Sequence, residues 1–381
     1  MSTCDLFFFI DACGAEVIRD HPAFTDLAPR WKPLRSVFGY SSACVPSIMS
    51  GLYPEEHLHW SFFTHGPGQS LKVPAWIRCL PAGLRDRGRV RGRLSPFIAR
   101  ANGITGYFQA YQMPFDRLGD YGHCEPRDIF KPGGLNRGTT FFDDLATTGL
   151  KASVSDWHRS TETNWQVATT EAADPAVRFV FVYDADLDAW LHDHTRQHAG
   201  LGDRLTAIRR RIEAVVAAAK TTHDRVRFYV FSDHGMATVQ RHLDPFPILA
   251  RTGLRMHEDY HIVIDSTMIR LWHHNERGRD QVRRVLDDVP GLRRLDAAYL
   301  ARERCAFPDS RFGEDIYLAE PHLLLVPSHM GTKPLMAMHG YDCDHQDSDA
   351  SLLTNDPSAD PTDIVGLNAL MRRSIAEAAE R

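Results

Sequence analysis

Three short apolar segments, each followed directly by acidic residues, constrain the fold of this chain more than any other feature. They are residues 6–10 (Leu-Phe-Phe-Phe-Ile), 178–183 (Arg-Phe-Val-Phe-Val-Tyr) and 227–231 (Arg-Phe-Tyr-Val-Phe). Short apolar runs without alternation are typical of strands buried on both faces, as in a parallel sheet. Between the second and third, residues 203–220 place apolar side chains at helical spacing. This order predicts an α/β fold, a doubly wound, mostly parallel sheet with helices on both faces.

The rest of the chain, from residue 1 to 381, is expected to complete one catalytic domain. Residues 60–143 are rich in glycine, proline, arginine and aromatic residues with little periodicity, which predicts an inserted cap. The other predicted elements are paired strands at 261–265 and 268–272, a helix at 279–289, strands at 316–319 and 322–326, a loop at 340–363 and a final helix at 364–380.

Composition narrows the function classes. The net charge of −5 and the pI near 6.5 argue against a general binder of nucleic-acid polymers. No stretch approaches the length of a membrane helix, so no membrane partner is expected. The seven cysteines are dispersed without a CxxC pair, and no leader peptide is visible, so we expect a reduced, cytoplasmic protein. The oligomeric state is not indicated.

Acidic residues at the ends of the predicted strands point to one shared site, because ligands bind beyond the carboxyl ends of parallel strands. Asp11 follows the first strand, and Asp233-His234-Gly235 follows the third. Asp188 and His192 are four residues apart, so on a helix both face one side and could share a metal ion. Taken alone, that pair is better explained by a solvated helix face, and His339-Gly340 fits a surface loop. The nearby competitors for the same role are Asp186, His194 and His198.

A nucleophile candidate lies before an apolar stretch at residues 43–49. Ser41 and Ser42 precede that stretch, as hydroxyl residues do at a helix start. The exposed N–H groups and the dipole of a helix N-terminus favour a phosphate there. A plain helix cap is the simpler explanation of the same pattern.

Taken in order, these motifs resemble the alkaline phosphatase superfamily, most nearly its nucleotide pyrophosphatase/phosphodiesterase branch. The resemblance covers residues 5–342 and includes Gly-Leu-Tyr-Pro-Glu-Glu-His at 51–57, Ser-Asp-His-Gly-Met at 232–236 and His-Gly-Tyr-Asp at 339–342. It implies an alkaline phosphatase-like fold and two divalent metal ions, with zinc expected from mixed Asp/His ligands and manganese as the alternative. It assigns Asp188, His192 and His339 to one ion, and Asp11, Asp233 and His234 to the other.

The resemblance also points to Ser41 as the nucleophile, because Ser41 stands ten residues before Gly51; Ser42 is the alternative. Family members often carry proline and asparagine two and three residues after the nucleophile, where this chain has Ala43 and Cys44. The missing asparagine puts nucleotide diesters in doubt. A sulfatase is not indicated, since the arginine of that motif is absent.

We therefore predict a two-metal phosphoester hydrolase that acts through a phosphoserine intermediate on a small phosphorylated metabolite or nucleotide, as a diester or a monoester. The alternatives are a phosphotransferase or mutase, and a non-catalytic metal-binding scaffold. The alternating arginines of 85–93 could funnel anions to the site, although a solvated loop is the favoured interpretation. A substrate could stack on Tyr107, Tyr111 and Phe115, but the favoured interpretation is that these side chains form the core of the cap.

Overall fold

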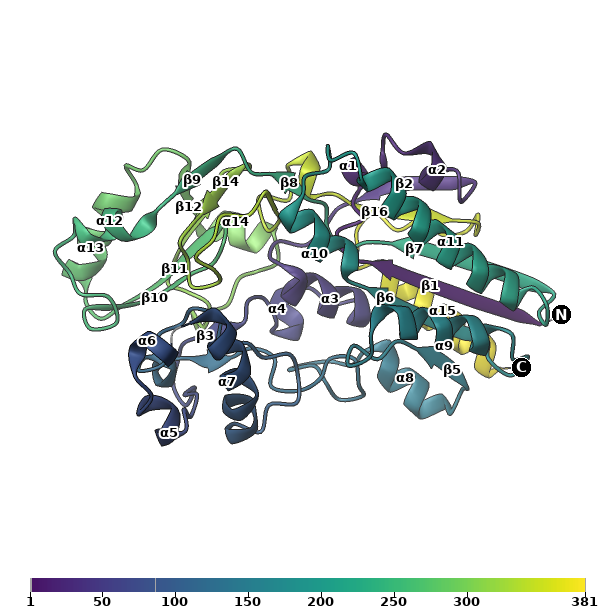
Figure 1. Ribbon diagram of the computed structural model, residues 1–381, viewed down its shortest axis with the longest axis horizontal. Helices are drawn as coiled ribbons and strands as arrows, with labels where there is room; N and C mark the ends of the chain where they lie inside the picture. Colours follow the sequence, from purple (N-terminus) through teal and green to yellow (C-terminus); the bar gives the residue numbers. More distant parts are fainter. Residues whose placement is uncertain (1, 86, 381) are drawn as a thin grey trace.

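A six-stranded sheet in the order β2-β16-β7-β1-β6-β5 forms the centre of the computed structural model, which describes residues 2–85 and 87–380 (Figure 1). β5, β6, β1 and β7 run parallel, β16 runs antiparallel to β7, and β2 is antiparallel to β16. The strands are β1 (Thr3–Ile10), β2 (Arg30–Leu34), β5 (Ala152–Val154), β6 (Phe179–Asp184), β7 (Arg225–Phe231) and β16 (Ala350–Thr354).

Helices cover both faces of this sheet, because its central strands bury side chains on both sides. In β1, Phe7 and Phe9 join the core beneath α3, α8 and α15, whereas Leu6, Phe8 and Ile10 join the core beneath α9 and α11. The doubly wound α/β fold is thus confirmed. The helices are α1 (Ala15–Ile18), α2 (Pro22–Thr25), α3 (Ser41–Ser50), α4 (Pro54–His57), α8 (Phe141–Thr148), α9 (Thr161–Ala172), α10 (Asp186–Asp193), α11 (Leu201–Ala219) and α15 (Leu367–Ala379).

A second, antiparallel sheet in the order β10-β11-β13-β12 lies at the other end of the molecule (Figure 1). The predicted pair at 261–265 and 268–272 forms its β10–β11 hairpin. Its elements are β10 (Tyr260–Ile264), β11 (Met268–His273), β12 (Leu292–Arg294), β13 (Asp315–Ala319), α12 (Pro245–Ala250), α13 (Glu276–Leu286) and α14 (Ala297–Arg302). Two small ribbons link the sheets, β8 (Ala237–Thr238) with β15 (Ala337–Met338) and β9 (Arg241–Leu243) with β14 (Leu323–Leu325).

Residues 62–123, here called the α5–α7 lobe, pack around an apolar cluster of their own. Phe63, Ile77, Leu94 and Tyr121 belong to it, and Trp272 of β11 joins it from the second sheet. Farther along the predicted cap, α8 packs into the core of the central sheet instead. The elements of the lobe are β3 (Phe63–Thr64), α5 (Ala75–Arg78), α6 (Ala82–Arg85), α7 (Gly88–Ala101), the 3₁₀ turn η1 (Leu118–Asp120) and β4 (Gly122–His123).

Two predictions of irregular structure are wrong. Residues 340–363 are not all loop, because they contain β16, together with the 3₁₀ turn η2 (Gln346–Ser348). The neighbouring Leu352 and Leu353 enter the opposite cores of the sheet, so a five-residue strand flanked by polar loops escapes detection by periodicity. The arginine stretch at 85–93 is not a loop throughout, because α7 starts at Gly88. Among the described residues no helix is long and apolar enough to span a membrane.

Candidate active site

The predicted site residues meet at the carboxyl edge of the parallel strands. Asp11 follows β1, and Asp233 and His234 follow β7. Asp188 and His192 lie on α10, which begins two residues after β6 ends, and His339 follows β15. Because neighbouring parallel strands end at the same sheet edge, residues far apart in sequence come together there.

Asp11, Asp233 and His234 form one potential metal-binding group. The Nε2 atom of His234 lies 3.2 Å from Asp233 Oδ2 and 3.5 Å from Asp11 Oδ1. One donor atom from each of the three residues falls within 4.8 Å of the others. The carboxylates are buried, with exposed fractions of 3% for Asp11 and 0% for Asp233. Three N/O donors at such distances can converge on a single divalent cation.

A second group adjoins the first. Asp188 places Oδ2 3.5 Å from His192 Nε2 and Oδ1 3.6 Å from His339 Nε2. The His339 ring stacks on His234 with centroids 3.7 Å apart, and Asp188, His234 and His339 also satisfy the 4.8 Å convergence. His192 touches this group through Asp188 but is not part of that tighter set. The two groups are therefore contiguous through His234.

The hydroxyl groups of Ser41 and Ser42 lie in different environments. Ser41, the first residue of α3, places Oγ 3.1 Å from His234 Nε2. Ser42 is buried and donates its hydroxyl proton to the carbonyl of Trp60 at 2.9 Å. Only the Ser41 hydroxyl therefore lies at the Asp/His cluster.

The charge balance of the site fits divalent cations. Asp11 Oδ1, Asp233 Oδ2 and Asp188 Oδ1 are buried and have no hydrogen-bond partner among the described residues. Burial, followed by repulsion from Asp233 and Asp188, raises the pKa of Asp11 well above its ordinary value. Burial also raises the pKa of Asp233. Buried carboxylates without partners are costly, and a bound cation would supply the missing partner.

The pKa of Asp188 shifts in the opposite direction to those of Asp11 and Asp233. Burial opposes its ionisation, but the hydrogen bond and charge of His192, with His339 and His234, hold its pKa below the ordinary value. The same contact with Asp188 outweighs burial and raises the pKa of His192. Asp188 therefore remains an anionic donor throughout the neutral range.

The backbone orients two of the imidazoles toward the cluster. Nδ1 of His192 donates to the carbonyl of Ala337 at 3.0 Å, and Nδ1 of His234 donates to that of Gly235 at 2.9 Å. With the proton on Nδ1, the Nε2 lone pair is free to bind a cation, as in metal-ligating histidines generally.

Gly235 serves close packing rather than an unusual backbone angle. A Cβ atom at this position would lie 2.4 Å from the carbonyl oxygen of Asp347 and 3.0 Å from that of Asp349. Only glycine lets the Asp233-His234 turn pack so tightly against the loop at 347–349.

Two contacts of the site were missed in the sequence. The hydroxyl of Tyr183, at the end of β6, donates to Asp11 Oδ2 at 2.6 Å. Ser36 Oγ donates to the carbonyl of Asp233 at 2.7 Å. The rule that strand ends meet at one edge applied to Tyr183 as well as to Asp11, whereas nothing in the sequence marks Ser36.

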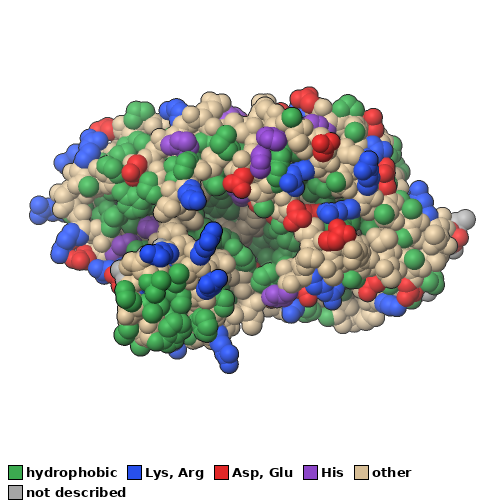
Figure 2. Space-filling model, viewed as in Figure 1, with side chains coloured by type: hydrophobic (Ala, Val, Ile, Leu, Met, Phe, Trp, Pro, Cys, Tyr) green, Lys and Arg blue, Asp and Glu red, His purple; other side chains and the backbone are tan. Residues whose placement is uncertain are grey.

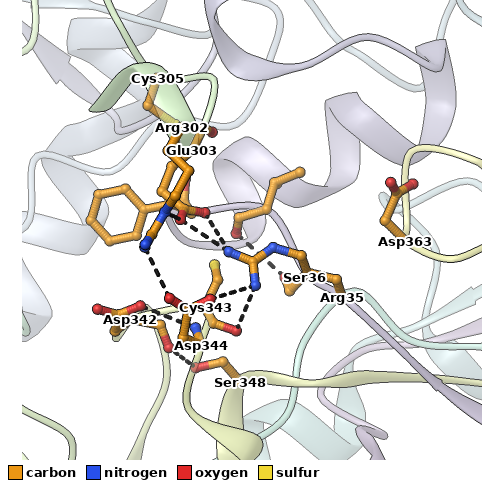
Figure 3. Close-up of polar contacts among 12 residues, drawn as sticks. Arg35, Ser36, Arg302, Glu303, Cys305, Asp342, Cys343, Asp344, Ser348 and Asp363 are labelled. Carbon is orange, nitrogen blue, oxygen red and sulfur yellow. Dashed lines mark hydrogen bonds and ion pairs between the residues drawn. The ribbon is translucent and has the colours of Figure 1, made fainter. Parts of the chain in front are cut away.

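The segment that leads into Ser41 is fixed by an ion-pair network (Figure 3). Arg35 Nη2 donates to the two carboxylate oxygens of Glu303 at 3.0 and 2.9 Å, and Nη1 donates to Asp344 Oδ1 at 2.7 Å. Arg302 also reaches Asp344, at 2.9 Å. Arg35 thus joins the end of β2 to the loop that follows His339, so that the segments carrying Ser41 and His339 are cross-linked.

The competing acidic and histidine candidates lie outside the cluster. Asp186 accepts a hydrogen bond from Thr161 Oγ1 at 2.8 Å. The His194 ring stacks on Trp190 at 4.5 Å, and the His198 ring meets Trp190 edge-on at 5.3 Å. Each has a local partner that accounts for its position.

A cavity of about 920 Å³ extends from the cluster toward the α5–α7 lobe, and Figure 2 shows the surface hollowed beside that lobe. Of the aromatic residues considered above, Tyr107 and Tyr111 line this cavity, whereas Phe115 is buried in the lobe. Of the described arginines between residues 85 and 93, only Arg89 lines it. Nothing in the sequence marks the loop at 326–335, which also lines the cavity and includes Lys333.

Comparison with solved structures shows the same fold. Murine ectonucleotide pyrophosphatase/phosphodiesterase 5 matches with a TM-score of 0.69 and 15% identity over 99% of this chain and 95% of its own. The human protein matches with a TM-score of 0.69 and 14% identity over 98% and 95%. An inactive form of the murine protein in complex with AMP matches with a TM-score of 0.67 and 14% identity over 99% and 95%. No relative was found among curated proteins.

The sequence profile described as type I phosphodiesterase / nucleotide pyrophosphatase matches residues 112–342, well over half of the chain. The match spans α10, the Asp233-His234 turn and His339. The chain therefore belongs to the type I phosphodiesterase/nucleotide pyrophosphatase family of the alkaline phosphatase superfamily, and it is a metal-dependent phosphoric ester hydrolase.

Proposed function

We propose that this chain is a two-cation phosphodiesterase in which Ser41 attacks a small, nucleotide-like diester. The observation that carries the proposal is the placement of the Ser41 hydroxyl 3.1 Å from His234 Nε2, at the junction of two contiguous Asp/His groups. Such a junction is where an in-line displacement at phosphorus needs its nucleophile.

Asp11, Asp233 and His234 would hold one cation, and Asp188, His192 and His339 the other. Mixed imidazole and carboxylate donors suit zinc, with manganese as the alternative. When bound, two such ions supply Lewis-acid stabilisation of the attacking and leaving oxygens. The unpartnered oxygens of Asp11, Asp188 and Asp233 support this assignment.

The chain itself positions the reacting groups. Ser41 is the first residue of the ten-residue helix α3, whose N-terminal N–H groups and dipole favour a phosphoryl group beside the hydroxyl. The Ser41 hydroxyl loses its proton and attacks phosphorus, and one alcohol of the diester leaves, taking up a proton. The covalent intermediate is a phosphodiester of Ser41 that keeps the other substituent, and water hydrolyses it to release a phosphomonoester and restore the serine. Tyr183 and the backbone partners of His192 and His234 hold the donor residues in orientation.

The size and lining of the cavity favour a diester over a monoester. About 920 Å³ is far more than a phosphate group needs and falls in the range of pockets that enclose a small organic ligand. Aromatic residues line one wall, namely Phe62, Tyr107, Tyr111, Phe130 and Trp157. The AMP bound by the murine relative is consistent with a nucleotide-like group there.

One departure from the family pattern has a structural counterpart. Cys44, where many members have asparagine, is fully buried, and its Sγ lies 3.5 Å from Ser36 Oγ. It points into the core and cannot contact the phosphate. The non-bridging oxygens of the substrate therefore need partners other than residue 44.

Ser41→Ala and Ser42→Ala form the matched test, assayed on bis-p-nitrophenyl phosphate and on p-nitrophenyl phosphate. We expect Ser41→Ala to lose at least about a thousandfold in kcat while its metal content is unchanged. Ser42→Ala should keep turnover within a fewfold, because it loses only a hydrogen bond to Trp60. An active Ser41→Ala enzyme would contradict the assignment of the nucleophile. A higher kcat/KM for the monoester would contradict the diester preference.

A further inference from the structure

The α5–α7 lobe carries a concentration of positive charge that the rest of the chain lacks. Residues 66–105 contain eight basic residues and one acidic residue, a net charge of +7, whereas the whole chain has a net charge of −5. Among the described residues, no ion pair involves six of these cations: Lys72, Arg78, Arg87, Arg89, Arg93 and Arg100. Their charges are therefore available to an external anionic partner.

Exposed apolar side chains accompany these cations. Trp76 is 49% exposed, Leu84 45% and Phe97 53%. They are three of the six large hydrophobic side chains that are exposed among the described residues. Trp76 and Phe97 contact each other edge to face with ring centroids 5.3 Å apart, which joins α5 and α7 in one apolar patch. Clustered exposed aromatic residues are typical of a binding surface.

Helix α7 separates a buried face from this outer surface. Leu94, Ser95 and Ile98 point into the lobe, while Arg93, Phe97 and Arg100 are exposed on the outside. Hydrophobic side chains gather over the lobe with basic side chains around them in Figure 2. Apolar aromatic residues flanked by arginines are the pattern of elements that lie in a membrane interface.

We propose that this surface, centred on Trp76, Leu84 and Phe97, docks the protein onto an anionic lipid bilayer. The aromatic side chains would enter the headgroup region, where tryptophan partitions favourably, and the arginines would contact lipid phosphates. The lack of a stretch as long as a membrane helix led to the expectation that no membrane partner exists, but that criterion does not cover docking at the bilayer surface. Arg89, beside the patch, also lines the cavity, so docking would bring the cavity close to the bilayer.

Vesicle cosedimentation of the full-length protein tests this proposal without using catalysis. We expect binding to phosphatidylcholine vesicles that contain phosphatidylglycerol, little binding to pure phosphatidylcholine, and weakening as salt rises. Tryptophan fluorescence should be quenched by brominated lipid, and Trp76→Phe should remove most of that quenching. Absence of binding to the anionic vesicles would overturn the proposal. Tighter binding to single-stranded RNA than to vesicles would also overturn it.

Two double variants and their matched controls separate docking from misfolding. Trp76→Ala with Phe97→Ala, and Arg93→Glu with Arg100→Glu, should each weaken vesicle binding at least about tenfold. The controls should leave vesicle binding unchanged. They are Trp31→Ala, at an exposed tryptophan of β2, and Arg210→Glu with Arg277→Glu, at exposed arginines that form no ion pair with another described residue. Hydrolysis of bis-p-nitrophenyl phosphate should persist in all four, which shows that they are folded. Equal loss in variants and controls would overturn the proposal.

Discussion

The carboxyl edge of the central sheet and the surroundings of Arg91 in the α5–α7 lobe differ in how a buried charged group is partnered. Among the described residues of the sheet edge, Asp11, Asp188 and Asp233 each have a buried oxygen without a hydrogen-bond partner. In the lobe, the buried guanidinium of Arg91 donates to the carbonyls of Tyr111 and Met113 and lies 4.1 Å from the Phe115 ring.

The first arrangement indicates a ligand-binding site, and the second indicates a contact that stabilises the fold. Unpartnered buried carboxylates cost stability and persist where a ligand completes them, whereas a satisfied buried cation fixes the chain. Arg91 holds residues 110–113, which place Tyr111 and Gln112 in the cavity wall. The sheet edge therefore provides the chemistry, and the lobe provides a shaped wall.

The largest effect is expected at the sheet edge. Asp233→Asn removes a negative donor, so kcat should fall at least about a thousandfold, with loss of bound metal measured by mass spectrometry. Asp184→Asn is the matched control, because Asp184 is equally buried but bonds to Trp165 and the amide of Asp186. It should keep its metal and turn over within a fewfold of the parent. Equal losses in both variants would remove the distinction between partnered and unpartnered carboxylates.

The next effect concerns Glu125, directly beyond the lobe. Burial raises its pKa to about 8, against about 4.3 in an unfolded chain. Between these values the folded state keeps a proton that the unfolded state loses, so this stabilising contribution is present at low pH and disappears as pH rises to 8. It amounts to roughly 3–5 kcal/mol.

Glu125→Gln, which is neutral at every pH, isolates that contribution. Urea unfolding of the parent and the variant at pH 5 and pH 8 should show the variant gaining stability relative to the parent at the higher pH. If the unfolding free energies of parent and variant differ by the same amount at pH 5 and at pH 8, Glu125 is ionised in the folded protein.

Arg91→Met should destabilise the lobe by about 2–4 kcal/mol, because the carbonyls of Tyr111 and Met113 lose the guanidinium that donates to them. Its metal content should remain that of the parent, in contrast to Asp233→Asn. Denaturant unfolding and metal analysis on the same sample check both halves of this prediction. Loss of metal in Arg91→Met would show that the lobe supports the sheet edge directly.

The smallest effect is expected for Tyr183→Phe. Without the 2.6 Å hydrogen bond to Asp11, the carboxylate is less well oriented, and metal affinity should fall about tenfold, measured by competition with a chelator. Tyr341→Phe, which loses a bond only to the carbonyl of Leu323, is the control and should bind metal like the parent. Unaltered affinity in Tyr183→Phe would remove Tyr183 from the support of the site.

The two regions also differ in how far the sequence predicts them. Strands β1, β6 and β7 were predictable because burial on both faces forces continuous apolar runs, and the residues that end them converge as parallel topology requires. The lobe was not predictable, because α5 and α6 are only four residues long and α7 contains Pro96 and many arginines. Tertiary contacts such as those of Arg91 hold these helices in place. Strand β16 was missed because five residues give too little pattern.

Within the site, the charged residues that could bind a cation were predictable from the sequence. The residues that hold them in place were not. Asp11 and Asp233 stand at strand ends, where pattern and chemistry coincide. Ser36 and the Ala337 carbonyl act through backbone geometry that only the folded chain reveals. The environments of Ser41 and Ser42 differ through Trp60, a contact between residues eighteen positions apart.

A crystal structure of the zinc-loaded protein, measured at the zinc absorption edge, tests the metal assignment most directly. Two anomalous peaks should appear, one among Asp11, Asp233 and His234 and the other among Asp188, His192 and His339, both within reach of Ser41 Oγ. A single peak, or peaks elsewhere in the molecule, would contradict a two-cation phosphodiesterase built on these six residues.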